Sequence, residues 1–229
     1  MQREYKKQCF FRFSPSDNRN RELWCLKHGE SGINTVCRVL EVSRKEIRTK
    51  EGGKNVVLNG IIADHSAKIT FVSWEEREEL AKDKVVQIEN AYVKKWNGRT
   101  ALFIGKTTSI IEKDIDFPSR TELMKPKKRT IGEIVGCEGA FDVIVEGDIV
   151  SVSRNEEKNK RVLDDGTGAV FLELSEKEKE ADMLFGTPVK ARGNVVESEI
   201  GYVLIAEKVK IKGGEVMIKG LKHFLCRYA

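Results

Sequence analysis

The sequence predicts an all-β protein with short helices, built from two tandem copies of a small five-stranded barrel. The 229-residue chain repeats itself, and each copy consists of short alternating segments separated by turn residues. Hydrophobic residues make up 40% of the chain, which is enough for a buried core in each copy. The order of the elements within a copy then indicates the type of barrel.

The repeat is visible in three pairs of matching segments. "CRVLEVSR", which begins at Cys37, matches "GDIVSVSR", which begins at Gly147, at an offset of 110 residues. "ADHSAKITF" matches "DDGTGAVFL" at an offset of 101, and "VVQIENAYVKKWNGRTALFI" matches "PVKARGNVVESEIGYVLIAE" at 103. The fall from 110 to 101 indicates that the second copy is nine residues shorter between its first two strands.

Each copy has five predicted strands, and a segment rich in helix formers follows the third. In the first copy we expect strands at 33–44, 55–63, 67–74, 85–96 and 99–107. In the second copy we expect them at 143–153, 160–163, 169–174, 189–198 and 202–211. The helical segments are "EEREELAKD" and "SEKEKEADMLF". Five strands with a helix after the third is the order of the OB-fold, which binds oligonucleotides on its second and third strands and the flanking loops.

These elements divide the chain into five parts. The expected barrels span residues 22–115 and 130–212, and a linker at 116–129 holds two of the four prolines. Residues 1–21 form an N-terminal extension without an assignment. In the C-terminal tail, 213–229, apolar residues fall at helical spacing and predict a short amphipathic helix. These residues are Met217, Ile218, Leu221, Phe224 and Leu225. We expect the chain to form homo- or hetero-oligomers through this helix.

Composition and motifs narrow the function classes. The chain has neither an apolar run of the ~20 residues that cross a bilayer nor a signal peptide, so we expect a cytoplasmic protein without a membrane partner. Five cysteines, an odd number without framework spacing, are expected to be reduced thiols. No P-loop, HExxH or dinucleotide fingerprint is present, so we expect neither an enzyme nor a cofactor.

Two groups of residues look like sites and are interpreted otherwise. "DHS" at Asp64–Ser66 holds catalytic-triad residue types, but three consecutive residues cannot reproduce triad geometry, and we expect a tight turn. Cys9, Cys25, His28 and Cys37 have no zinc-site spacing beyond the pair in "CLKH", so we expect no metal.

The first copy resembles a known family. The run "INTVCRVLEVS", a basic loop, "ADHSAKITFVSW" and "VVQIENAYVKKWNGRTALFIG" is similar to an OB domain of archaeal replication protein A. The second copy resembles it more weakly, and together the matches cover roughly residues 22–212. The resemblance implies binding of single-stranded DNA in replication, repair and recombination. It also implies that Trp74 and Trp96 stack on bases. The chain lacks the paired CxxC zinc ribbon that large subunits of that family often carry.

The residues themselves support a stacking platform on the first barrel. If Ile69 and Phe71 point into the core, alternation puts Trp74 on the opposite face, and Trp96 ends the fourth strand just before a turn. Stacking on aromatic rings is tolerant of sequence. The alternative is that Trp74 packs under the following segment. The expected platform comprises Trp74, Trp96 and Phe103, and the cations beside it are Lys68, Lys94, Lys95 and Arg99.

The loop between the first two strands is the second expected contact with nucleic acid. It is long, it has Gly52 and Gly53 at its tip, and it borders the binding groove of this fold. Its basic residues are Arg44, Lys45, Arg48, Lys50 and Lys54. We expect them to contact phosphates, and the alternative is a solvated hairpin tip.

The two copies differ at the expected site. Applying the offsets places Ser175, Glu199 and Tyr202 where the first copy has Trp74, Trp96 and Arg99. Residues 33–113 carry 15 Lys and Arg against 11 Asp and Glu, net +4, whereas residues 130–212 carry 11 against 17, net −6. We therefore expect the second barrel to bind nucleic acid weakly, through Phe171 and Tyr202, or to bind protein.

Two other readings of the sequence stay open. The chain could be an RNA-binding OB module, because nothing in the sequence reads the 2′-hydroxyl. It could also be an assembly subunit whose barrels and tail mainly hold other proteins.

Overall fold

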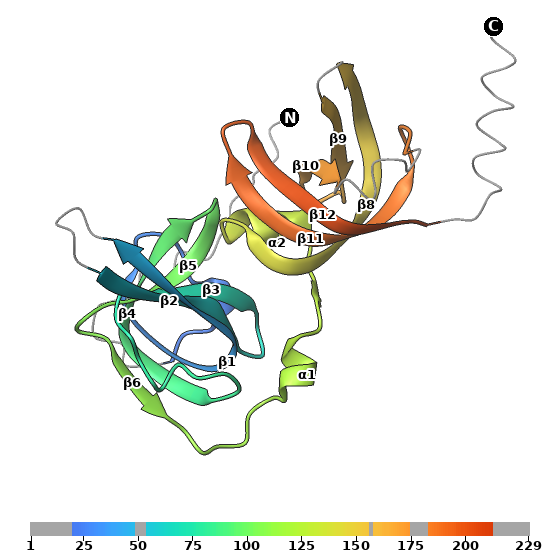
Figure 1. The fold of residues 1–229 in the computed structure, drawn as a ribbon. Coiled ribbons are helices and arrows are strands. Elements are labelled where there is room, and N and C mark those ends of the chain that lie inside the picture. Colours follow the sequence, from blue (N-terminus) through green and yellow to red (C-terminus); the bar gives the residue numbers. More distant parts are fainter. Residues whose placement is uncertain (1–19, 49–53, 156–157, 175–182, 213–229) are drawn as a thin grey trace, which may run out of the picture.

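The structure is a computed structural model that describes residues 20–48, 54–155, 158–174 and 183–212 (Figure 1). The expected C-terminal helix in residues 213–229 and nearly all of the N-terminal extension lie outside the described residues. Within the described part of the chain, no helix combines the length and the apolar character needed to cross a membrane.

The first barrel, barrel 1, is a closed sheet of five strands. Their order is β1-β2-β3-β5-β4, and β4 pairs back onto β1. The pairing of β3 with β5 is parallel, and the other pairings are antiparallel. A short strand, β6 (Ser109–Glu112), extends the sheet beyond β4. The five barrel strands are β1 (Ser31–Arg48), β2 (Lys54–Ala63), β3 (Lys68–Ser73), β4 (Val85–Trp96) and β5 (Arg99–Ile104).

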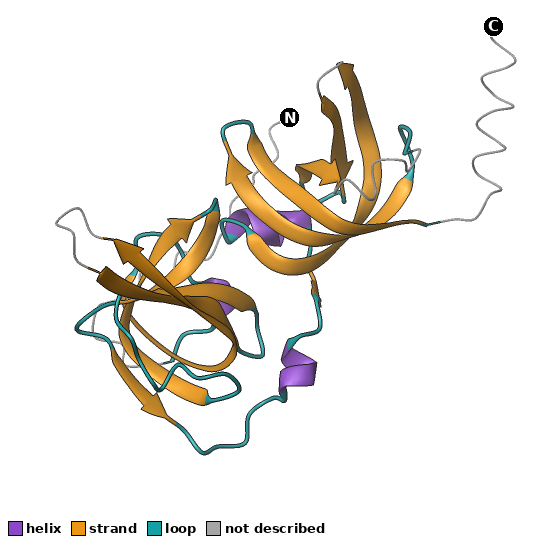
Figure 2. Cartoon of the chain, in the orientation of Figure 1, coloured by secondary structure: helices purple, strands orange, loops and turns teal. Residues whose placement is uncertain are grey.

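Barrel 2 repeats this topology. Its order is β8-β9-β10-β12-β11, with β11 closing onto β8, a parallel pairing of β10 with β12, and β7 (Lys127–Lys128) added beside β8. Figure 2 shows the two orange sheets as separate bodies joined by loops and short helices. The predicted fold class, two tandem OB-fold barrels, is confirmed. The barrel strands are β8 (Ala140–Asn155), β9 (Lys158–Asp164), β10 (Ala169–Leu174), β11 (Pro188–Ser198) and β12 (Gly201–Ile211).

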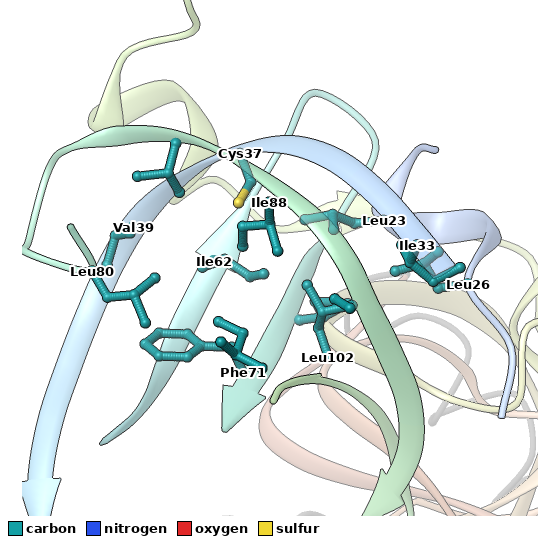
Figure 3. Packing of buried hydrophobic residues seen from close by; sticks show 14 of the residues in the cluster. Leu23, Leu26, Ile33, Cys37, Val39, Ile62, Phe71, Leu80, Ile88 and Leu102 are labelled. Carbon is teal, nitrogen blue, oxygen red and sulfur yellow. The ribbon is translucent and has the colours of Figure 1, made fainter. Parts of the chain in front are cut away.

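The core of barrel 1 follows from the period-two alternation of its strands. Ile62 of β2, Phe71 of β3 and Leu102 of β5 point inward (Figure 3). All three are buried, as is Leu58 of β2 in the same cluster. Cys37 lies among them, and burial raises the pKa of its thiol far above the ordinary value. A thiol that stays protonated and covered is structural rather than reactive.

A tight turn ties the segment that enters each barrel to the third strand. Asp64 accepts hydrogen bonds from the backbone N–H of Ser66 (2.7 Å) and, across 41 residues, from that of Leu23 (2.8 Å), which begins the short helix η1 (Leu23–Cys25). Asp165 of barrel 2 accepts the matching bond from Ile131 (2.7 Å) in α2 (Ile131–Gly136). The interpretation of Asp64–Ser66 as a turn is confirmed, and its role is to satisfy backbone donors at the barrel entrance.

The expected helix after the third strand is absent in barrel 1. Residues 75–84 form bends and turns, with Leu80 buried in the core and Asp83 at a positive φ of 69°. Arg77 pairs with Glu75 two positions away, a spacing at which side chains do not meet on a helix. Insertion of Leu80 into the barrel therefore overrides the helix propensity of this segment. Residues 175–182 of the corresponding segment in barrel 2 lie outside the described residues.

The two barrels are held together by a polar interface. Lys68, 5% exposed, donates to Asp142 of β8, and Arg192 of β11 donates to the other carboxylate oxygen at 2.6 Å. Burial raises the pKa of Asp142, but the hydrogen bonds from both cations outweigh burial and hold that pKa below its ordinary value. Trp24 packs against both cores beneath the guanidinium of Arg129, which lies 4.1 Å from the ring centroid.

The connection between the barrels contributes to this interface. It runs from β6 through the short helix α1 (Arg120–Leu123) to β7. The backbone carbonyl of Met124, which ends α1, accepts a hydrogen bond of 2.8 Å from Lys68. Arg129 donates to the carbonyl oxygen of Ser66 at 2.7 Å. Both bonds return to the turn and strand β3 of barrel 1, so the connection packs along that barrel before barrel 2 begins.

Candidate nucleic-acid interface

The outer face of barrel 1 has its own cluster of side chains, separate from the core. Strand register places Asn59 of β2 opposite Val72 of β3, Val72 opposite Phe103 of β5, and Phe103 opposite Tyr92 of β4. Val72, Phe103, Val57 and Ala101 form a buried cluster against which Tyr92 packs. The row therefore crosses the sheet on the side away from the core.

Three aromatic rings gather on this face. Tyr92 and Phe103 are stacked with their centroids 5.5 Å apart, and Trp96 meets Phe103 edge-on at 6.1 Å. The Nζ of Lys94 lies 5.0 Å from the Tyr92 centroid and 5.9 Å from that of Phe103. Trp96 is 39% exposed, whereas Phe103 is only 4% exposed. Phe103 thus supports the exposed rings, and it does not offer a free face as the sequence suggested.

Trp74 directly follows β3 and is 42% exposed. By alternation it belongs to the face of Val72, while Phe71 and Ser73 are fully covered. The alternative in which Trp74 packs under the next segment disagrees with this exposure. Alternation thus assigns Trp74 to the face that carries Trp96, and the parallel pairing of β3 with β5 puts the two exposed tryptophans at opposite ends of it.

A groove runs beside Trp96. Its volume is about 320 Å³, and it lies between β1, β2, β3 and the β4–β5 turn. Asn59, Thr70 and Arg99 line it together with Trp96. The Oδ1 of Asn59 is covered and has no hydrogen-bond partner among the described residues. A groove with an aromatic wall and polar side chains beside it is suited to a flat heterocyclic ring.

The β4–β5 turn fixes the residues at the end of the groove. Asn97 and Gly98 both have positive φ, 51° and 73°, which is the requirement of a two-residue type I′ hairpin turn. This turn sets Trp96 directly opposite Arg99. The "NGR" sequence thus determines the spacing between the stacking ring and the cation.

Arg99 carries a charge that no carboxylate among the described residues neutralises. Its guanidinium lies 5.0 Å from the centroid of Phe141 in barrel 2, and its Nε and Nη1 are covered without a hydrogen-bond partner in the described chain. Burial lowers the pKa of Arg99 below its ordinary value. A half-buried cation without a carboxylate partner is stabilised by any anion that reaches it.

The predicted lysines have three different positions. Lys94 lies exposed on the aromatic face, as expected. Lys95 is paired with Glu197 of barrel 2, and the hydrogen bond that Lys95 donates to this carboxylate raises the pKa of Lys95. The structure corrects the prediction that Lys68 contacts phosphate. Lys68 is enclosed between the barrels by Asp142 and cannot reach a phosphate, because packing between the barrels covers the start of β3.

The basic loop is only partly described. Lys50 lies outside the described residues, and for Arg48 and Lys54 the structure describes the backbone at the ends of β1 and β2 but not the side chains. Lys45 is exposed. Arg44 is also exposed, and it pairs with Glu76 at 2.9 Å. Its charge is therefore partly satisfied by a surface ion pair, which is weak and screened by salt.

Sequence reasoning missed three residues of this site. Tyr92 lies two and four positions before Lys94 and Trp96, so strand alternation alone could have placed it on the same face. Asn59 could have been found by the same rule from Val57. Phe141 comes from barrel 2, and no pattern within the sequence of barrel 1 signals it.

Strand register corrects the internal alignment near the second hairpin. In barrel 1 Trp96 pairs with Arg99 across a two-residue turn, and in barrel 2 Ser198 pairs with Gly201 in the same way. The equivalents of Trp96 and Arg99 are therefore Ser198 and Gly201, one residue before the predicted Glu199 and Tyr202. The slip arises because β4 has one extra residue: three residues separate Ile88 and Ala91, the partners of Thr35 and Ile33, whereas two separate the equivalent Ala191 and Gly193 of β11.

No group of three or more His, Cys, Asp or Glu side chains that could hold a metal ion occurs among the residues that the structure covers. No protein-family model matches the chain, and no curated protein matches it.

Solved structures do match. An OB domain from Thermoplasma acidophilum is 23% identical over 43% of this chain and 90% of that domain, with a TM-score of 0.39. A replication protein A heterotrimer bound to single-stranded DNA matches 90% of this chain and 55% of its own at 16% identity and a TM-score of 0.39. A murine DNA-binding protein bound to double-stranded DNA matches 78% of this chain and 97% of its own at 10% identity, with a TM-score of 0.39. Likenesses this distant carry no argument about what the chain binds.

Proposed function

We propose that this chain is a single-stranded DNA-binding protein that holds its ligand on the outer face of barrel 1 with little sequence specificity. The observation that carries the proposal is the combination of two exposed tryptophans on one sheet face with the uncompensated Arg99 at its end. We propose a binding protein rather than an enzyme.

The tryptophans supply the sequence-independent part of the affinity. Every base has a π-face, and stacking on an aromatic side chain contributes about 1–3 kcal/mol per base. Trp96 is held edge-on by Phe103, which is itself stacked on Tyr92, so its ring is ordered before a ligand arrives. An ordered ring loses less conformational entropy on binding than a mobile one.

The cations supply the phosphate contacts. Lys94 stands over the aromatic rings, and Arg99 faces the groove with its charge unpaired in the described structure. Single strands expose their bases for stacking and duplexes do not, so this arrangement favours single strands. A role in replication, repair and recombination is part of the proposal, and the sequence resemblance to archaeal replication protein A supports it.

A salt-dependent titration tests the function. Labelled oligo(dT), oligo(rU) and a duplex of matched length are titrated with the full chain, and fluorescence anisotropy gives the dissociation constant at several salt concentrations. We expect tightest binding to oligo(dT), together with quenching of tryptophan emission. Preference for the duplex would contradict the proposal, and preference for oligo(rU) would change the ligand to RNA.

A further inference from the structure

The tips of the equivalent hairpins of the two barrels touch. The backbone N–H of Glu197 donates to the carbonyl oxygen of Gly98 at 2.8 Å, and the Glu197 carboxylate pairs with Lys95. A Cβ added at Gly98 would lie 2.7 Å from the Glu197 carbonyl oxygen, so the approach is too close for a side chain. The β4–β5 turn, which carries the site, is therefore clamped by β11.

Phe141 of β8 adds a second contact from barrel 2 at this turn. Its ring lies beneath the Arg99 guanidinium, which has no carboxylate partner in the described chain. Both residues line a small cavity of about 30 Å³ between the barrels, and Arg99 also lines the groove. The ring face holds the planar cation by cation–π attraction without neutralising it, whereas a carboxylate at this place would cancel its charge.

We propose that barrel 2 contributes a positioning residue, Phe141, that holds Arg99 toward a phosphodiester in the groove of barrel 1. This inference rests on the proposed function. Phe141 acts through Arg99 and does not itself touch the ligand. The binding site then extends over both barrels, and barrel 1 alone lacks a part of it, whereas the sequence predicts only weak nucleic-acid binding or protein binding for the second barrel.

The test uses the full chain with Phe141→Leu, which keeps apolar volume but removes the ring, and Phe141→Tyr, which keeps the ring. Phe185→Ala is the control, because Phe185 is exposed on barrel 2 at 68%. We expect Phe141→Leu to weaken oligo(dT) binding about three- to tenfold, through faster dissociation, and Phe141→Tyr and Phe185→Ala to bind as the wild type does.

A double-mutant cycle with Arg99→Met separates positioning from general structure. If Phe141 acts through Arg99, Phe141→Leu has no further effect on the dissociation constant in the Arg99→Met background. An equal loss in both backgrounds, or no loss in either, would overturn the inference.

Hydrogen exchange keeps the two proposals distinguishable. Without any ligand, the amides of residues 95–100 should exchange faster in Phe141→Leu than in the wild type, because the clamp is weakened. If the wild-type chain fails to bind oligo(dT), the proposed function fails. Unchanged exchange and unchanged affinity in Phe141→Leu would instead overturn the positioning role alone.

Discussion

The outer face of barrel 1 and the corresponding face of barrel 2 share a register and differ in chemistry. Four equivalent positions hold Tyr92, Phe103, Trp96 and Arg99 in barrel 1 and Asn194, Ile205, Ser198 and Gly201 in barrel 2. No aromatic ring or cation of the first face has a counterpart at these positions. The second face also belongs to a copy with a net charge of −6, against +4 in the first.

The inward positions of the same strands show no such difference. Val93 and Val195 are equivalent and buried, and so are Leu102 and Leu204. The residues that build the barrel and the residues that build the site thus alternate along one strand and can vary independently. Duplication of this fold therefore repeats the scaffold without repeating the site.

The largest effect is expected from the tryptophans. Replacing Trp74 and Trp96 together with Ala should cost about 2–6 kcal/mol of binding free energy, because two stacking faces are removed while the core stays intact. The dissociation constant for labelled oligo(dT) gives the loss, and circular dichroism checks the fold. Wild-type affinity in a folded double variant would mean that the two faces do not differ in function.

The stability of the protein should depend on the contact between the two barrels. Asp142→Asn should lower the free energy of unfolding by about 3 kcal/mol at pH 7, because it leaves Lys68 buried beside a neutral partner. Urea denaturation followed by tryptophan fluorescence measures this. The exposed Asp148→Asn is the control.

The ion pair of Lys68 with Asp142 also predicts that the free energy of unfolding depends on pH. The pKa of Asp142 in the folded protein lies below the ordinary value of 3.8. The stability that ionised Asp142 contributes is therefore fully present above about pH 4, and it is lost as the pH falls through the lower pKa of the folded state. The difference between wild type and Asp142→Asn should therefore shrink below pH 4. A constant difference down to pH 2 would contradict this assignment.

Arg99→Gln should have a smaller effect on binding free energy, on the order of 1 kcal/mol. It should also lower the slope of log K against log salt by about 0.7, which is the contribution of one phosphate contact on a single strand. Lys208 is an exposed residue of β12 in barrel 2. Lys208→Gln is therefore the matched charge control, and it should leave the slope unchanged. Equal slopes for wild type and Arg99→Gln would remove the arginine from the site.

The smallest effect on binding is expected from the outer face of barrel 2. Phe171→Ala combined with Ile205→Ala in barrel 2 should change oligo(dT) affinity by less than about 0.5 kcal/mol. The same anisotropy titration measures it. A loss as large as that of the tryptophan pair would show that barrel 2 stacks bases through residues other than the equivalents of Trp74 and Trp96.

Most of the fold could be predicted because it depends on local patterns. Alternation and turn residues placed all ten barrel strands, and "NG" before Arg99 fixed a hairpin that the structure contains. The absence of a helix after the third strand of barrel 1 could not be predicted, because Leu80 packs into a core formed by distant strands. Local propensity contains no information about that contact.

The site could be predicted only where it depends on a single strand. Exposure of Trp74 and Trp96 follows from alternation, as does the position of Lys94. The enclosure of Lys68 and the pairing of Lys95 depend on how the barrels pack together, which no repeat or composition encodes.

The aspartate of each turn has a consequence for how the chain folds and opens. Asp64 and Asp165 bind backbone amides 41 and 34 residues earlier in the chain, so each entering segment docks only after the turn before the third strand has formed. Such a segment is also the first that can detach without unravelling the sheet. Protease attack on the native protein should therefore begin just ahead of β1 and β8. A truncation that starts at either strand would remove one of the amide donors of the turn aspartate.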